Sequence, residues 1–138
     1  MVKKSEFLEK VDFFSSSGPH GVLEAIDNSQ IGFHPARVYW IRGVPENGIR
    51  GNHAHKELRQ VFVCLTGSFL LELYDSKTRH VQRIQQGNSF RLQPGLWRVL
   101  SDFASNTIVL VICSHPYDET DYIRSWADFL TWKSRNER

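Results

Sequence analysis

Short runs of β-forming residues, separated by turn residues at regular intervals, dominate the chain from about residue 21 onward. The runs cover residues 22–26, 37–42, 60–65, 69–74, 81–85, 88–92, 97–101 and 107–113. Many short strands at such spacing are typical of an all-β sandwich or barrel. Residues 43–48 and 93–95 contain proline and glycine and are predicted loops, because proline removes a hydrogen bond from a paired strand.

The chain changes character after Pro116. An acidic stretch at residues 118–121 is typical of a helix start, and apolar residues then recur at helical spacing at Ile123, Trp126, Phe129 and Leu130. A chain of 138 residues suffices for one core. We therefore expect a single domain over 1–138, with residues 1–20 partly mobile, a barrel over 21–115 and a short C-terminal helix over 118–132.

Composition narrows the function classes. With 17 basic and 15 acidic residues the net charge is +2, too small and too evenly spread to indicate nucleic-acid binding. No apolar run approaches the ~20 residues of a membrane span, and the N-terminus is charged where a secretory signal would be apolar. We expect no membrane partner and a cytoplasmic location. Cys64 and Cys113 lie in apolar runs and are expected to be buried and reduced.

The most informative histidines are His53 and His55. Residues two apart on a strand point to the same face, so the pair would aim both imidazoles into one cavity. A surface pair or a core histidine is the alternative, and it is the preferred interpretation for the isolated His20, His34 and His80.

The spacing around this pair resembles the first motif of the cupin superfamily, here Gly48, His53, His55, Gln60 and Gly67. The resemblance implies a single cupin, or jelly-roll, barrel. In metal-binding cupins a Glu and a third histidine complete the ligand set. Here Gln60 occupies the Glu position, and Trp97-Arg98-Val99 offers no histidine after the Pro94-Gly95 turn. We therefore expect no metal and interpret the pair as acid–base groups.

Two longer strings carry a closer resemblance. Residues 50–56 (RGNHAHK) and 117–124 (YDETDYIR), with Val44-Pro45, Gln60 and Gly67-Ser68, look like the sugar 3,4-ketoisomerases over residues 20 to 131. These are cupin enzymes that act on dTDP-4-keto-6-deoxyglucose in the biosynthesis of unusual deoxy and amino sugars. The resemblance implies that the keto group moves from C4 to C3 through an enediol, with no cofactor. Asn52 and residues 98–101 depart from the family pattern, so the product configuration at C4 stays open.

The implied chemistry assigns roles to residues in this sequence. Imidazole exchanges protons near neutral pH, so His53 is expected to move the carbon-bound proton and His55 the protons of the oxygens. Arg50 and Gln60 are candidate donors to the enediolate. Strict strand alternation places Arg50 opposite His53, so its role requires a bulge or bend at Gly51.

The remaining candidates are substrate-binding residues. Lys56 is expected to meet the diphosphate, Tyr39 and Trp97 to stack on the thymine or cover the sugar, and Arg98 to contact the substrate. The resembling enzymes are homodimers with an N-terminal strand that pairs across subunits. We extend that expectation to residues 22–26.

Three other functions are alternatives for a chain with this histidine pair. A dTDP-sugar 3,5-epimerase would pair a histidine with a tyrosine acid, which the sequence does not locate. A non-catalytic sugar-nucleotide-binding cupin is disfavoured by the intact His53 and His55. A metal-dependent cupin oxygenase is disfavoured by Gln60 and by the lack of a third histidine.

Overall fold

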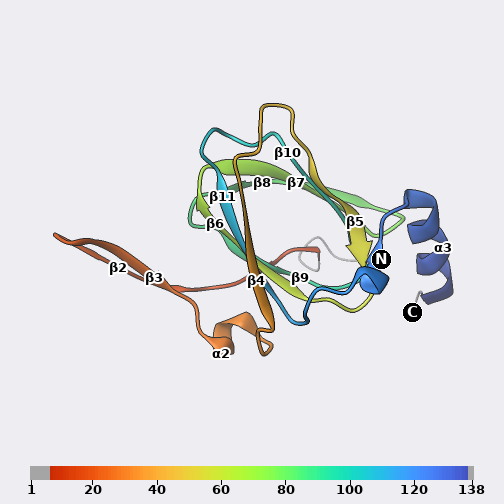
Figure 1. Ribbon diagram of the computed structural model, residues 1–138, viewed down its shortest axis with the longest axis horizontal. Coiled ribbons are helices and arrows are strands. Elements are labelled where there is room, and N and C mark those ends of the chain that lie inside the picture. Colours follow the sequence, from red (N-terminus) through yellow and green to blue (C-terminus); the bar gives the residue numbers. More distant parts are fainter. Residues whose placement is uncertain (1–6, 137–138) are drawn as a thin grey trace.

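The computed structural model describes residues 7–136, and it consists of two facing five-stranded sheets with a projecting hairpin and a C-terminal helix (Figure 1). The first sheet has the strand order β1-β9-β6-β11-β4. Its strands are β1 (Glu9–Lys10), β9 (Ser89–Leu92), β6 (Gln60–Thr66), β11 (Ile108–Cys113) and β4 (Arg37–Arg42). All of its neighbouring strands are antiparallel.

The second sheet has the order β12-β5-β10-β7-β8 and is also antiparallel throughout. It contains β12 (Tyr122–Ile123), β5 (Arg50–His55), β10 (Trp97–Ser101), β7 (Ser68–Tyr74) and β8 (Arg79–Gln85). The two sheets form a jelly-roll sandwich of the cupin type rather than a continuous closed barrel. The prediction of an all-β cupin fold is confirmed.

The core lies between the sheets because the strands alternate apolar residues inward. Strand β7 shows this clearly, since Phe69, Leu71 and Leu73 are buried while the residues between them are partly exposed. They meet Phe62, Phe90, Leu92, Leu100, Val109 and Val111 from both sheets. Cys64 and Cys113 are buried and free, as expected.

A second apolar cluster covers the outer face of the first sheet. Helix α2 (Asn28–Ile31) and the residues around it place Ile31 and Phe33 against Val61, Val63 and Ile112. The predicted hairpin over β7 and β8 is also present. Its turn is held by Asp75, whose carboxylate accepts hydrogen bonds from the backbone N–H groups of Lys77 and Thr78.

The N-terminal part of the chain adds an arm that the sequence pattern only partly indicated. Strands β2 (Phe14–Gly18) and β3 (Gly21–Ala25) pair only with each other and project from the sandwich (Figure 1). Every residue in both strands is exposed. Of residues 1–20, which we expected to be partly mobile, 1–6 lie outside the described residues.

The C-terminal helix is present but shorter at its start than predicted. Helix α3 covers Trp126–Asn136 and buries Phe129 against Ala54, Trp97 and Ile123. Residues 118–123 instead form the 3₁₀ turn η1 (Glu119–Asp121), capped by the Asp118 side chain, and strand β12. Pairing with β5 draws these residues into the sheet. Within residues 7–136, no helix has the length and apolarity to cross a membrane.

Candidate active site

A cleft of about 360 Å³ opens between the two sheets. Side chains of β4 form one wall, and side chains of β5, β10 and β12 form the other. The polar and charged residues that line it are Arg37, Tyr39, Arg50, His53, Arg98, Tyr122 and Arg124. Four arginines around one histidine make the cleft suited to an anionic ligand.

A β-bulge in β5 positions the key side chains. Arg98 is opposite His53 and the next residue of β10, Val99, is opposite Gly51, so Asn52 is the extra residue. Gly51 and Asn52 both have positive φ, 80° and 60°. A Cβ on Gly51 would lie 2.9 Å from the Arg98 carbonyl oxygen, so the close strand contact requires glycine. The bulge that an active-site Arg50 requires is therefore present, and Arg50 lines the cleft with His53.

The hydrogen bond of His53 defines which nitrogen can act as a base. Its Nδ1 lies 2.9 Å from the Gly51 carbonyl oxygen, which can only accept, so Nδ1 carries the proton. Nε2 then keeps its lone pair. Burial, followed by the nearby Arg98 charge, lowers the pKa of His53 from 6.5 to about 4. His53 is thus a neutral proton acceptor at physiological pH.

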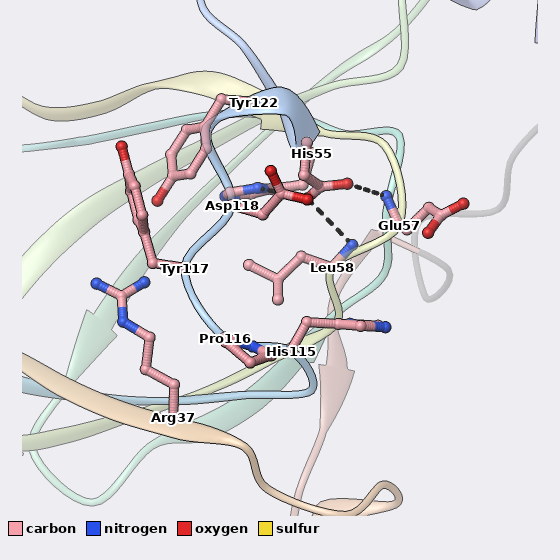
Figure 2. A pocket seen from close by; sticks show the side chains of 10 residues that line it. Arg37, His55, Glu57, Leu58, His115, Pro116, Tyr117, Asp118 and Tyr122 are labelled. Atoms are coloured by element: carbon pink, nitrogen blue, oxygen red, sulfur yellow. Dashed lines mark hydrogen bonds and ion pairs between the residues drawn. The ribbon is translucent and has the colours of Figure 1, made fainter.

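His55 lies behind His53 rather than beside it in the cleft. It is 1% exposed, its ring is edge-on to that of His53 with centroids 4.8 Å apart, and it borders a second pocket of about 50 Å³ (Figure 2). Its Nδ1 lies 3.0 Å from Asp121 Oδ2, whereas Nε2 is buried with no hydrogen-bond partner in the part of the chain that the structure describes. Burial and the Arg98 charge lower the pKa of His55 to about 2. The two imidazoles are in contact, but the prediction that both point into one cavity is wrong, because His53 lines the cleft and His55 borders the smaller pocket.

A buried polar network supports the floor of the cleft. Arg98 is 1% exposed and donates to Gln60 Oε1 at 2.7 Å and to the Leu96 carbonyl at 3.0 Å, while its Nε has no hydrogen-bond partner among residues 7–136. The Gln60 amide donates to the Tyr39 hydroxyl at 3.2 Å, and burial raises the pKa of Tyr39 to about 12. Tyr39 is therefore a protonated phenol whose oxygen already accepts one bond, which leaves its own proton free to donate.

Three sequence-predicted residues occupy other places. Gln60 does not line the cleft, because its amide and carbonyl are engaged behind Tyr39 and Arg98. Trp97 packs against Phe129 under α3, since alternation along β10 turns it away from the face that carries Arg98. Lys56 is exposed and borders a groove between β12 and α3. Neither stacking by Trp97 nor a diphosphate contact by Lys56 fits these positions.

The structure also adds residues to the site. Tyr122 contacts both histidine rings and borders both pockets, Arg37 and Arg124 line the cleft, and Asp121 bonds His55. Asp121, Tyr122 and Arg124 belong to the string at 117–124. The resemblance carried by that string did not indicate a role for any one of them. Within residues 7–136, no three His, Cys, Asp or Glu side chains are placed to hold a metal ion.

Comparisons with known proteins identify the family to which the chain belongs. The family model FdtA, described as WxcM-like, C-terminal, matches residues 6–134. A TDP-4-oxo-6-deoxy-alpha-D-glucose-3,4-oxoisomerase from Aneurinibacillus thermoaerophilus is 37% identical over 123 residues, which are 86% of this chain and 87% of the relative.

Solved structures of sugar-nucleotide enzymes share this fold. QdtA, a sugar 3,4-ketoisomerase from Thermoanaerobacterium thermosaccharolyticum solved in complex with TDP, superposes with a TM-score of 0.89 at 30% identity, covering 96% of this chain and 98% of that one. NovW from Streptomyces spheroides, a 4-keto-6-deoxy sugar epimerase, shares the fold with a TM-score of 0.70 and 13% identity. The match covers 85% of this chain and 68% of NovW.

Proposed function

The chain belongs to the FdtA family, and from that premise we propose that it is a sugar 3,4-ketoisomerase, which moves the keto group of a dTDP-linked 4-keto-6-deoxyhexose from C4 to C3. The observation that supports the chemistry most directly is His53, which lines an arginine-rich cleft and whose Nδ1 bond to the Gly51 carbonyl leaves Nε2 unprotonated. The reaction needs only a base, a means to stabilise an enediolate, and a proton returned to carbon.

His53 is the proposed carbon base. Its Nε2 removes the C3 proton, the electrons of that bond form the C3–C4 double bond, and the C4 carbonyl oxygen gains a proton. Loss of the C3 hydroxyl proton then forms the C3 carbonyl as a proton is returned to C4. A neutral imidazole with a low pKa is a weak base, so the enediolate needs strong stabilisation. The guanidinium of Arg98, desolvated and with a free Nε–H, supplies a preorganised positive charge beside the cleft.

The sugar oxygens on C3 and C4 must also lose and gain protons as the carbonyl moves. Tyr39, whose hydroxyl proton is free to donate, and Tyr122 supply phenols along the cleft. We propose that His55 serves the oxygens from behind His53, because its bare Nε2 is buried next to the Tyr122 ring, with centroids 4.4 Å apart.

The arginines at the cleft suit the nucleotide part of the substrate. Arg37, Arg50 and Arg124 line the same opening, and guanidinium groups bind diphosphates through paired hydrogen bonds. We propose these three for the diphosphate in place of Lys56.

The test is incubation with dTDP-4-keto-6-deoxyglucose, identification of the product by NMR, and trapping with a 3-aminotransferase. A product with its carbonyl at C3 supports the proposal. We expect conversion to proceed in EDTA, because no step uses a metal. The geometry also suits a second function, a 3,5-epimerase, since Tyr39 or Tyr122 could act as its acid. An epimerase would leave the carbonyl at C4 and invert ring carbons, so the same spectrum separates the two.

The pH profile is a direct consequence of the low pKa of His53. Neutral His53 is the active form, so turnover should be flat from pH 9 to about 5 and fall only as pH approaches about 4. A loss of turnover near pH 6.5 would contradict this mechanism. Folding must be checked at each pH by circular dichroism, because the unfolded chain binds more protons than the folded one below pH 6.5, so stability falls as pH falls toward 4.

We propose further that the protein is a homodimer in which the β2–β3 hairpin of each copy packs on the other. The hairpin exposes Phe14, Val22 and Leu23, each more than half exposed, and within residues 7–136 its strands pair with no other strand. Edge strand β4 exposes Val38 and Trp40 on its outer face. An unpaired edge and exposed apolar side chains are features that association would cover.

Light scattering after size-exclusion chromatography should therefore report a dimer. Deletion of residues 1–30 should leave an unstable or aggregated protein, because it removes the arm and also Phe7 and Val11 from the apolar clusters of the sandwich. Leu23→Asp is a more specific test, since it should shift the monomer–dimer equilibrium toward the monomer without removing the arm. Val81→Asp, at an exposed apolar position on β8, is the matched control and should stay dimeric. A folded, active monomer from the deletion would refute the arrangement.

A further inference from the structure

The carboxylate of Asp121 makes an unusually complete set of contacts to the residues around His55. Oδ1 accepts from the Glu57 N–H at 2.8 Å, and Oδ2 lies 3.0 Å from His55 Nδ1 and 3.3 Å from the Leu58 N (Figure 2). The Asp121 carbonyl also accepts from the Lys56 N–H at 3.0 Å. Both backbone partners of the carboxylate are obligate donors, so it can act only as an acceptor at these contacts.

We propose that Asp121 is a positioning residue for the isomerisation, which holds His55 in the tautomer with its proton on Nδ1. This inference rests on the proposed function. A carboxylate with no proton to give accepts from Nδ1–H, so the lone pair of the ring must reside on Nε2. Nε2 is buried and has no other partner, so nothing else in the described chain selects the tautomer.

The consequence is a matched pair of imidazoles. His53 has its proton on Nδ1 because the Gly51 carbonyl accepts it, and His55 has its proton on Nδ1 because Asp121 accepts it. Both rings thus present a bare Nε2 and neither carries a charge. The wrong tautomer of His55 would put a proton on Nε2 and remove one of the two acceptors.

Asp121→Asn tests this assignment. The amide has one acceptor where the carboxylate had two, so its NH₂ must take the place of one oxygen. If Oδ1 keeps the Glu57 bond, the NH₂ faces His55 Nδ1 and selects the opposite tautomer. We expect kcat to fall about 10²-fold or more, as an inverted tautomer does in other histidine dyads, with KM changed less than about threefold.

Asp118→Asn is the matched control. Asp118 lies three residues earlier and borders the same small pocket. Among the described residues its carboxylate bonds only Thr120, through a single oxygen that asparagine retains, and its backbone bond to the Asp121 N–H is unaffected by the change. The Asp118→Asn variant should have the same kcat as the wild type. Asp121→Glu keeps the carboxylate and should recover part of the lost kcat. Wild-type activity in Asp121→Asn would overturn the proposal.

The tautomer itself can be measured without substrate. Long-range ¹H–¹⁵N NMR of the histidine-labelled wild type should show a protonated Nδ1 and an unprotonated Nε2 for His55, and Asp121→Asn should reverse them. A protonated Nε2 in the wild type would overturn the proposal even if the variant fails to fold. The expected tautomer in a wild type that shows no isomerisation would instead refute the proposed function alone.

Discussion

His53→Asn is expected to abolish both isomerisation and exchange of the C3 hydrogen with solvent deuterium. Asparagine cannot accept a proton at the position of Nε2, so the step that starts the reaction is lost. We expect kcat to fall by about 10⁴-fold, the upper end of the range that positioned acid–base groups contribute, which leaves no turnover to detect in this assay. dTDP affinity, measured by calorimetry, should stay within about twofold, because the proposed diphosphate contacts come from Arg37, Arg50 and Arg124.

His55→Asn is the internal comparison. His55 does not line the cleft, so its loss should slow isomerisation but allow some C3 exchange, since a carbanion can form and return without completing the carbonyl shift. Exchange retained in His53→Asn but lost in His55→Asn would reverse the two assignments. Melting temperatures of both variants must accompany the rates. Equal unfolding of both would mean that the pair serves mainly to pack the sandwich.

Arg98→Met is expected to lower kcat by about 10²–10³-fold, the usual cost of removing a preorganised donor to a developing oxyanion. A second effect should accompany it. The Arg98 charge helps to lower the pKa of His53, so its removal should raise that pKa above about 4 and move the acid limb of the pH profile upward. Steady-state kinetics from pH 4 to 9 measure both effects.

Folding should tolerate this change. Methionine fills much of the same volume. Among the described residues Arg98 forms no salt bridge, so removal of this desolvated cation offsets the loss of its bond to Gln60. Arg79→Met, at an exposed arginine on β8, is the control for loss of one positive charge and should leave both kcat and the pH limb unchanged. A kcat within tenfold of wild type in Arg98→Met would remove Arg98 from enediolate stabilisation.

The strands were largely predictable from local pattern, because burial in a sheet imposes an alternation that each strand carries in its own residues. The predicted strand at 37–42 is β4, and that at 97–101 is β10. The arm and the end of the chain were less predictable. Strand β2 has no apolar alternation because both of its faces are exposed, and β12 forms only because β5 is available as a partner.

The candidate site likewise combines features set by local sequence with features set by tertiary contacts. The sequence alone determined that His53 and His55 lie close together and that Arg50 needs a bulge to join them, because strand geometry and glycine conformation are local properties. Only the tertiary structure decided which residues surround them. Asp121 reaches His55 across 66 positions, and β4 brings Tyr39 to Gln60. Such contacts depend on how sheets and turns pack. Alternation along β10 places Trp97 and Arg98 on opposite faces, but only the packing decided that one face meets helix α3 and the other the cleft.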